Sequence, residues 1–257
     1  MNPERIWRLF ATGLSFALFG LGGVLLALTW FPLLLLCVRN RRRRSELAQA
    51  GMHRMLWLFS HIMQWLGAIS FEIDDISTLR NLHGTLVVAN HPSLIDVVLI
   101  MGHMRHTRAV VKKGVWQNPF MAATARACDF IPNHADPERL IDSCTDALRE
   151  GSNLCIFPQG SRRPAEDRSS YQRGFAHVAL ASGADILPLT ITVDPPFLRK
   201  GEPWYAVPPT RSHWKIRVLD PIKPDAAAIE QGSITARSLT RNVQRIIQTE
   251  LEGVKQA

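Results

Sequence analysis

The chain begins with a long apolar stretch. From Leu9 to Val38 the sequence carries no charged residue. About 20 helical residues cross a bilayer core of about 30 Å, so this stretch is long enough to span a membrane. It exceeds the apolar region of a signal peptide, which favours a retained anchor. Helix-interrupting residues leave two arrangements open, one tilted helix or two shorter helices that enter and leave the same leaflet. These residues are Gly13, Gly20, Gly22, Gly23 and Pro32.

A basic run follows the apolar stretch directly. Five of the six residues from Arg39 to Arg44 are arginine. Arginines beside a membrane segment mark the cytoplasmic side and attract anionic head groups. We therefore expect residues 1–44 to form a membrane anchor with a basic flank. The rest of the chain is expected on the cytoplasmic face of an inner membrane.

Residues 45–70 show a helical repeat of apolar positions. This pattern predicts an amphipathic helix, and Trp57 and Trp65 are suited to a membrane interface. Two interpretations remain open for it, a helix lying on the bilayer or a helix packed on the following domain. The apolar positions are Met52, Met55, Leu56, Phe59, Ile62, Met63, Leu66 and Ile69.

Short β-branched runs then alternate with helical patterns over residues 71–257. Such alternation predicts an α/β domain with a mixed, largely parallel sheet flanked by helices. Two helices are expected before the last strands, at 137–150 and 171–182, and an amphipathic one at 233–254. A proline-rich loop is expected at 194–209. The expected strands are 71–73, 86–89, 108–111, 130–131, 154–157, 186–193 and 215–219.

A histidine and a carboxylate follow the second expected strand. Asn90-His91-Pro92-Ser93-Leu94-Ile95-Asp96 comes directly after it. Pro92 suits a first helical turn, so we expect a helix from Ser93 to Met101. Ligands of α/β folds bind at the carboxyl ends of strands. An aspartate one helical turn on can orient the imidazole, so that His91 acts as a general base. The alternative is that the two residues do not interact and that Asp96 is simply a first-turn carboxylate stabilised by the helix dipole.

A turn with two arginines follows the strand at 154–157. It reads Phe157-Pro158-Gln159-Gly160-Ser161-Arg162-Arg163. Backbone N–H groups in such a turn can bind an anion, and guanidinium groups suit phosphate or carboxylate. The alternative is an ordinary surface turn with solvated arginines.

Together these blocks resemble the glycerolipid acyltransferase superfamily, which includes the 1-acylglycerol-3-phosphate acyltransferases. The N-H-x-x-x-x-D block is matched by Asn90, His91 and Asp96. The F-P-E-G-T/S-R block is matched by Phe157, Pro158, Gly160, Ser161 and Arg162. Further similarity lies at residues 112–120 and 186–191, and the resemblance covers roughly residues 50 to 225.

The resemblance implies transfer of an acyl group from a thioester to a lipid hydroxyl. His91 would be the general base and Asp96 would orient it. Gln159, Gly160, Ser161 and Arg162 would bind the acceptor. Lys113 or the Gly114 backbone would contact the oxyanion or the donor. The donor would be acyl-CoA or acyl-carrier protein, as a substrate, with no further cofactor.

Two positions depart from the family pattern. Gln159 stands where the family usually has glutamate, and Asn133 stands near the place of a usual arginine. An amide has no charge and adds two N–H donors. We therefore expect an acceptor other than ordinary lysophosphatidic acid. The alternative is that Arg163, Arg126 or Lys113 supplies the missing contact.

Composition narrows the range of partners. Lys and Arg number 30 against 22 Asp and Glu, which suggests an anionic partner. The anionic bilayer surface is favoured, with acyl-carrier protein as a second partner; no nucleic-acid-binding pattern occurs. No metal-ligand spacing occurs, so no metal is expected. The sequence does not determine the oligomeric state. Two other functions remain open, a non-catalytic lipid-binding protein and a thioester or lipid hydrolase.

Overall fold

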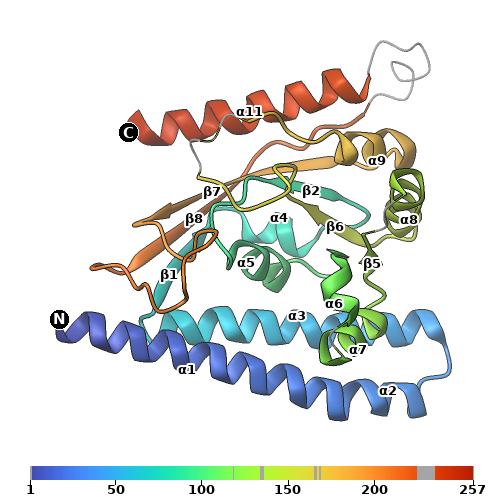
Figure 1. Cartoon of the computed structure of the whole chain (residues 1–257). Coiled ribbons are helices and arrows are strands. Elements are labelled where there is room, and N and C mark those ends of the chain that lie inside the picture. Colours follow the sequence, from blue (N-terminus) through green and yellow to red (C-terminus); the bar gives the residue numbers. More distant parts are fainter. Residues whose placement is uncertain are drawn as a thin grey trace.

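A six-stranded sheet organises the protein in a computed structural model, which describes residues 2–117, 119–133, 136–164, 167, 169–224 and 235–256. Its strand order is β1-β8-β7-β2-β6-β3, and every neighbouring pair is parallel except β7 and β8. Helices cover both faces of the sheet (Figure 1). The predicted α/β class, with a mixed and largely parallel sheet, is confirmed. The strands are β1 (Ile69–Ile73), β2 (Leu86–Ala89), β3 (Thr107–Arg108), β6 (Asn153–Ile156), β7 (Ile186–Asp194) and β8 (Ser212–Val218).

The helices form two layers around this sheet. Helix α11 lies over one face, and α4, α5 and α3 lie in succession below the other (Figure 1). A separate two-stranded ribbon pairs β4 (Val110–Val111) with β5 (Ile131–Pro132). The helices of the domain are α3 (Arg41–Trp65), α4 (Ile76–Arg80), α5 (Asp96–His103), α6 (Lys113–Gln117), α7 (Pro119–Ala127), α8 (Pro137–Arg149), α9 (Gly174–Ser182) and α11 (Ala236–Gln256).

Strand β2 lies at the centre of two apolar clusters. Side chains alternate between the faces of a strand. Leu86 and Val88 accordingly join the cluster that includes Val243 of α11. Val87 and Ala89 join the cluster that includes Phe59 of α3. All four strand residues are fully buried, so β2 is fixed from both sides, and with it the segment that follows.

The N-terminal segment is a single continuous helix of 35 residues, Pro3–Cys37, which is long and apolar enough to cross a membrane. It consists of α1 (Pro3–Leu25), a π-helical stretch (Leu26–Trp30) and α2 (Phe31–Cys37). Proline cannot donate to the helical ladder, and the widened π turn precedes Pro32, which lies in the first turn of α2. The arrangement as two separate helices is therefore wrong. This helix packs along α3 (Figure 1).

Several predicted boundaries are wrong. Helix α3 begins at Arg41, so the basic run forms its first turn rather than a separate flank, and it ends at Trp65 rather than residue 70. The expected strand at 108–111 is divided between β3 and β4. Ser233 and Ile234, at the start of the expected last helix, lie outside the described residues.

His103 makes the stability of this fold sensitive to acid. Burial lowers the pKa of this imidazole from 6.5 to about 4. The unfolded chain therefore binds a proton between these values while the folded chain does not, and stability falls as the pH falls through this window. We expect a loss of about 2 kcal/mol from His103 between pH 7 and pH 4.5. Denaturant titrations at both pH values should show a smaller loss for His103→Asn, and an identical loss would contradict this assignment.

Candidate active site

The sheet brings three separate segments to one edge. Strands β7, β2 and β6 are adjacent and parallel, so their carboxyl ends lie side by side. His91 follows β2, the Phe157–Arg163 turn follows β6, and a loop that includes Phe197 follows β7. Strand β8 runs antiparallel to β7 and begins at the same edge, which places Trp214 beside Val193. The structure thus brings the two motifs to one edge of the sheet.

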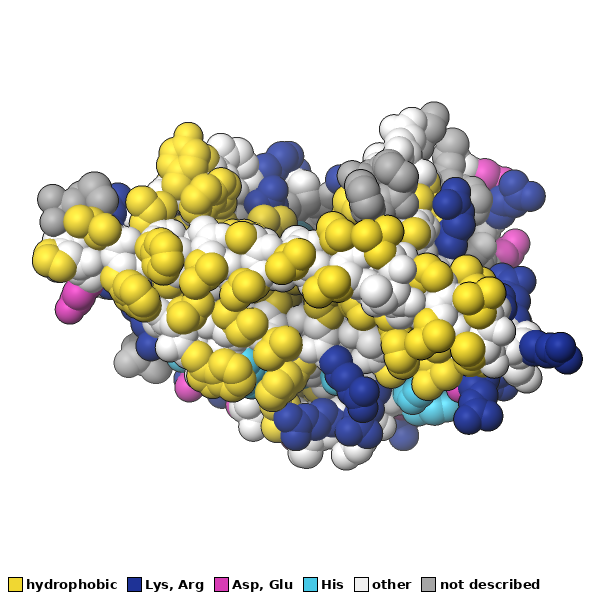
Figure 2. Space-filling model, turned by 90° about the horizontal axis from the view of Figure 1, so that it is seen from below, with side chains coloured by type: hydrophobic (Ala, Val, Ile, Leu, Met, Phe, Trp, Pro, Cys, Tyr) yellow, Lys and Arg dark blue, Asp and Glu magenta, His cyan; other side chains and the backbone are white. Residues whose placement is uncertain are grey.

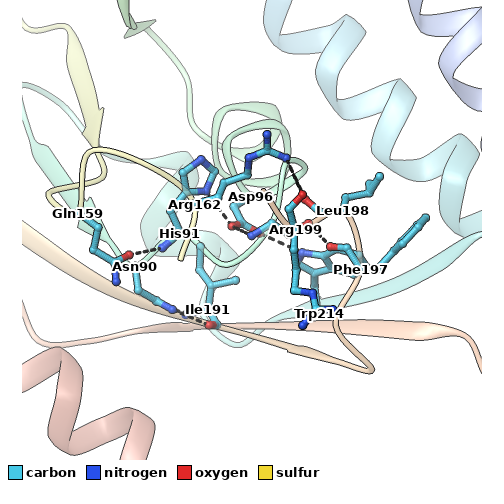
Figure 3. Close-up of polar contacts among 11 residues, drawn as sticks. Asn90, His91, Asp96, Gln159, Arg162, Ile191, Phe197, Leu198, Arg199 and Trp214 are labelled. Carbon is cyan, nitrogen blue, oxygen red and sulfur yellow. Dashed lines mark hydrogen bonds and ion pairs between the residues drawn. The ribbon is translucent and has the colours of Figure 1, made fainter. Parts of the chain in front are cut away.

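His91 and Asp96 form a direct pair. His91 Nδ1 lies 2.9 Å from Asp96 Oδ2 (Figure 3). A carboxylate acceptor places the proton on Nδ1 and leaves the lone pair on Nε2. Nε2 has no hydrogen-bond partner within the described part of the chain, and the His91 side chain is 16% exposed. The imidazole also stacks on Phe157, with ring centroids 4.1 Å apart. The ring is therefore oriented while one nitrogen is open to a substrate.

Asp96 is fully buried and receives further hydrogen bonds. The Ser93 backbone N–H donates to Oδ2 at 2.7 Å, and Trp214 Nε1 donates to Oδ1 at 3.0 Å. Burial raises the pKa of the Asp96 carboxyl, while the bonds from His91, Ser93 and Trp214 oppose that rise. Helix α5 begins at Asp96, so Pro92 and Ser93 precede it, and the predicted helical start at Ser93 is wrong.

Trp214 belongs to this site although no sequence motif predicts it. It lies 118 positions from Asp96 along the chain and is fully buried. The only signal was its position just before the expected strand at 215–219. The register of β8 against β7 brings it to the site, and that register is visible only in the structure.

Asn90 connects the first motif to β7. Its Nδ2 donates to the Ile191 carbonyl at 2.8 Å, and its Oδ1 accepts from the Ile191 N–H at 2.7 Å. Both backbone polar groups of the buried residue Ile191 are thereby satisfied. Asn90 thus fixes the start of the His91 loop to the neighbouring strand.

Asn90→Ala should destabilise the fold. The substitution leaves a buried N–H and a buried C=O without partners, at about 1–3 kcal/mol each. We expect the free energy of unfolding to fall by about 2–6 kcal/mol in denaturant titrations. Asn90→Asp keeps the acceptor for the Ile191 N–H but sets a second carboxylate oxygen against the Ile191 carbonyl in a buried position, so it should also destabilise the fold. An unfolding free energy for Asn90→Ala equal to that of the wild type would refute this role.

Gln159 supports the His91 backbone. Its Oε1 accepts from the His91 N–H at 3.0 Å, and the side chain is buried. A glutamate could accept the same bond. Binding of acceptor hydroxyls by Gln159 stays a prediction. Because Oε1 is bonded to the His91 N–H, the Nε2 group would make that contact. Gly160 adopts φ of +71°, which favours glycine in the turn.

Arg162 is held by the loop after β7. Its guanidinium donates to the Leu198 carbonyl at 3.0 Å and to the Arg199 carbonyl at 3.3 Å (Figure 3). Two bonds join the same loop to the first motif: Leu94 N–H to the Leu198 carbonyl, and the Ser93 hydroxyl to the Phe197 carbonyl. This loop therefore borders the site. Its carbonyl groups accept hydrogen bonds from one nitrogen of the Arg162 guanidinium, the group predicted to bind the acceptor.

The remaining predicted residues are less closely tied to His91. Ser161 is half-buried in the turn, and the Arg163 backbone N–H donates to the His91 carbonyl while its side chain pairs with Asp167 at 2.9 Å. Lys113 and Gly114 lie in α6, and no hydrogen bond of the described residues connects Gly114 with the pair. The oxyanion role of Lys113 or Gly114 stays a prediction.

Known proteins with similar sequences are acyltransferases. Residues 70–192 match the family model described as Acyltransferase. A chloroplastic 1-acyl-sn-glycerol-3-phosphate acyltransferase of Brassica napus is 23% identical over 65% of this chain and 48% of its own length. The enzyme of the same name from Cocos nucifera is 26% identical over 52% and 46%, and that from Limnanthes alba is 27% identical over 68% and 63%. The chain thus spans about half the length of the first two relatives.

A solved structure shares the fold over nearly the whole chain. The 1-acyl-sn-glycerophosphate acyltransferase PlsC of Thermotoga maritima superposes with a TM-score of 0.72. It is 19% identical, and the match covers 96% of this chain and 98% of that chain. The family-model match and the named relatives confirm the predicted resemblance, and the solved structure confirms the fold. Residues 70–192 match the Acyltransferase family model, and both motifs of the site lie within that range.

Proposed function

We propose that this protein transfers an acyl group from a thioester to the hydroxyl of a lysolipid. The observation that carries the proposal is the His91–Asp96 pair, in which Asp96 orients Nδ1 and Nε2 has no partner among the described residues. A single oriented imidazole at a sheet edge suits a general base acting on an alcohol. The acyltransferase match of residues 70–192 supports this reaction class.

The proposed reaction needs no protein nucleophile. His91 Nε2 takes the proton of the acceptor hydroxyl while the oxygen forms a bond to the thioester carbonyl carbon. The C–S bond then breaks, and the departing thiolate takes the proton from the imidazolium. The products are an ester and a free thiol. Asp96 stabilises the imidazolium between these two steps.

The second motif is proposed to receive the anionic part of the acceptor. Arg162 lies on the segment that follows β6, beside His91, and it has guanidinium donors beyond the one bonded to the loop. The named relatives act on 1-acyl-sn-glycerol-3-phosphate, which makes a phosphate-bearing lysolipid the first acceptor to test. Other lysolipids are also proposed as acceptors, because Gln159 and Asn133 depart from the family pattern.

We also propose that the protein works at a membrane. The Pro3–Cys37 helix exposes apolar side chains, and an apolar band runs along the face of the molecule shown in Figure 2. Helix α3, which packs along this helix, exposes Leu58 and Trp65. Such a continuous exposed apolar face is typical of a membrane contact. Arg5 and Arg8 tie this helix to the loop that borders the site, through the carbonyls of Val207 and Pro209. The basic run supports a cytoplasmic location. The exposed apolar residues of the helix are Ile6, Trp7, Phe10, Leu18, Leu21, Val24, Leu25, Leu28, Leu33, Leu35 and Leu36.

An acceptor panel tests the proposal. The purified full chain would be incubated in detergent with acyl-CoA or acyl-carrier-protein thioesters and with different lysolipids, and products would be identified by mass spectrometry. We expect an esterified lipid and an equal amount of free thiol. Free fatty acid formed equally with and without acceptor would indicate a hydrolase, and the absence of any product would indicate a binding protein.

Comparison with Gln159→Glu tests the role of this position. Because Gln159 Oε1 contacts the His91 backbone, glutamate should keep the loop in place. If Gln159 selects the acceptor, the order of preferred lysolipids should change in the variant. An unchanged order of preferred lysolipids would show that Gln159 does not select the acceptor.

A further inference from the structure

A second site lies at the opposite edge of the sheet from His91. A cavity of about 470 Å³ opens between α3, the end of α4 and the turn that connects α5 to β3. Arg54 of α3, Arg80 of α4 and Arg105 of the turn line it, together with His53, Trp57 and Glu46. Helix α5 starts at Asp96 and ends at His103, so its length separates the cavity from the catalytic pair.

The positive charge of this cavity is uncompensated. Arg54, Arg80 and Arg105 are exposed, and none has a hydrogen bond or an ion pair with its side chain within the described ranges. The single carboxylate in the lining, Glu46, pairs with Arg42 at 3.2 Å. His53 Nδ1 lies 3.2 Å from the carbonyls of Met101 and Met104. Three guanidinium groups therefore remain available to an anion.

A neighbouring cavity shows the contrast. It has a volume of about 600 Å³ and is lined by Arg41, Arg42 and Arg108. Arg41 pairs with Asp129 at 3.3 Å, and Arg108 pairs with Glu150 at 2.7 Å. Its arginines are neutralised by carboxylates of the chain itself. The larger cavity therefore offers less free positive charge than the smaller one, and we base the choice of anion site on unpaired arginines instead of on volume.

The smaller cavity borders the exposed apolar face. Trp57 lines it and stacks on His61, with ring centroids 3.9 Å apart. It also packs edge to face with Trp65, with ring centroids 6.4 Å apart. Trp65 and Leu58 are exposed on the same helix. Lys and Arg side chains gather beside the apolar band in Figure 2. An anion in the cavity would thus lie beside hydrocarbon, as a lipid head group does.

We infer that this cavity binds the phosphate group of an anionic phospholipid whose acyl chains lie against the apolar face of α1 and α3. Guanidinium groups bind phosphate through paired donors, and each basic group near an anionic surface strengthens lipid binding. The inference rests on the proposed membrane association and not on acyl transfer. The bound lipid is neither donor nor acceptor, because the site is separate from His91.

Calorimetric titration of the full chain in non-ionic detergent tests this inference. The ligands are short-chain phosphatidylglycerol, short-chain phosphatidylcholine and inorganic phosphate. The cavity variant is Arg54→Gln/Arg80→Gln/Arg105→Gln. The matched control is Arg237→Gln/Arg241→Gln/Arg245→Gln, which removes the same number of exposed charges from α11, on the other face of the sheet.

We expect saturable phosphatidylglycerol binding that is about tenfold or more weaker in the cavity variant and unchanged in the control. Equal affinity in the cavity variant, or equal binding of phosphatidylcholine, would overturn the inference. Inorganic phosphate binding as tightly as phosphatidylglycerol would indicate a site for soluble anions and would overturn it too. If the triple variant does not fold, Arg105→Gln alone should still weaken binding several-fold.

The same preparations separate this inference from the proposed function. Acyl transfer from detergent-dispersed substrates should be unchanged in the cavity variant, because none of its residues contacts the His91 site. A wild type that transfers no acyl group but binds phosphatidylglycerol would contradict the proposed function alone. A wild type that transfers acyl groups and shows no cavity-dependent lipid binding would contradict this inference alone.

Discussion

His91→Ala is expected to abolish acyl transfer and to leave the protein folded. The His91 imidazole leaves Nε2 without a partner among the described residues, and general-base catalysis contributes about 10²–10⁴-fold. Loss of the base should therefore lower kcat by at least about 10²-fold. The measurement is the initial rate of ester formation with saturating thioester and acceptor, followed by mass spectrometry.

Stability must be measured alongside the rate. Alanine removes one of the hydrogen bonds to the buried Asp96 carboxylate, which should cost about 1.5–3 kcal/mol. Asp96 keeps its bonds to Ser93 and Trp214, so the fold should survive that loss. His177→Ala serves as the control, because His177 is an exposed histidine of α9. A folded His91→Ala protein that retained more than about a tenth of the wild-type rate would refute the assignment of the base.

The contact between His91 and Asp96 could be predicted because its signal is local. His91 and Asp96 are five positions apart, and the motif directly follows a strand that is apolar throughout. The turn from Phe157 to Arg163 follows β6, which is apolar from Leu154 to Ile156. The sequence placed each motif directly after a strand, and the parallel pairing of β2 with β6 in the structure brings both motifs to one edge.

The supporting contacts could not be predicted, because they depend on distant pairing. Trp214 reaches Asp96 only through the register of β8 on β7, and Arg162 meets Leu198 only through the path of the loop after β7. Neither contact leaves a periodic pattern in the sequence. The helix boundary at Asp96 was missed for a related reason. The Asp96 carboxylate accepts from the Ser93 N–H and so holds Pro92 and Ser93 in a turn before the helix.

The arginine cluster of the 470 Å³ cavity could not be predicted from the sequence either. Arg54, Arg80 and Arg105 come from three different segments, and each reads in the sequence as an ordinary surface charge. The sequence pointed instead to the contiguous run at 39–44. In the structure two of those arginines, Arg41 and Arg42, are paired with Asp129 and Glu46. A dense run of charge in the sequence is therefore not the same as available charge on the surface.

Asp96→Asn is expected to have the second large effect. The Asp96 oxygens accept from His91 Nδ1, the Ser93 N–H and Trp214 Nε1. Asparagine has one oxygen, and in either orientation its NH₂ group faces at least one N–H donor. The substitution also removes the charge that stabilises the imidazolium. We expect kcat to fall by roughly 10²–10⁴-fold and the free energy of unfolding to fall by about 1–3 kcal/mol.

Trp214→Phe provides the graded comparison for this prediction. It removes the donor to Oδ1 and keeps both the Asp96 charge and the bond between His91 and Oδ2. Its effect on kcat should therefore be smaller, about tenfold, although its effect on stability is of the same order, about 1.5–3 kcal/mol. Rates and unfolding free energies of the two variants separate the two roles of the carboxylate. If Asp96→Asn and Trp214→Phe lowered kcat equally, Asp96 would act only by holding the loop in place, and its charge would have no part in proton transfer.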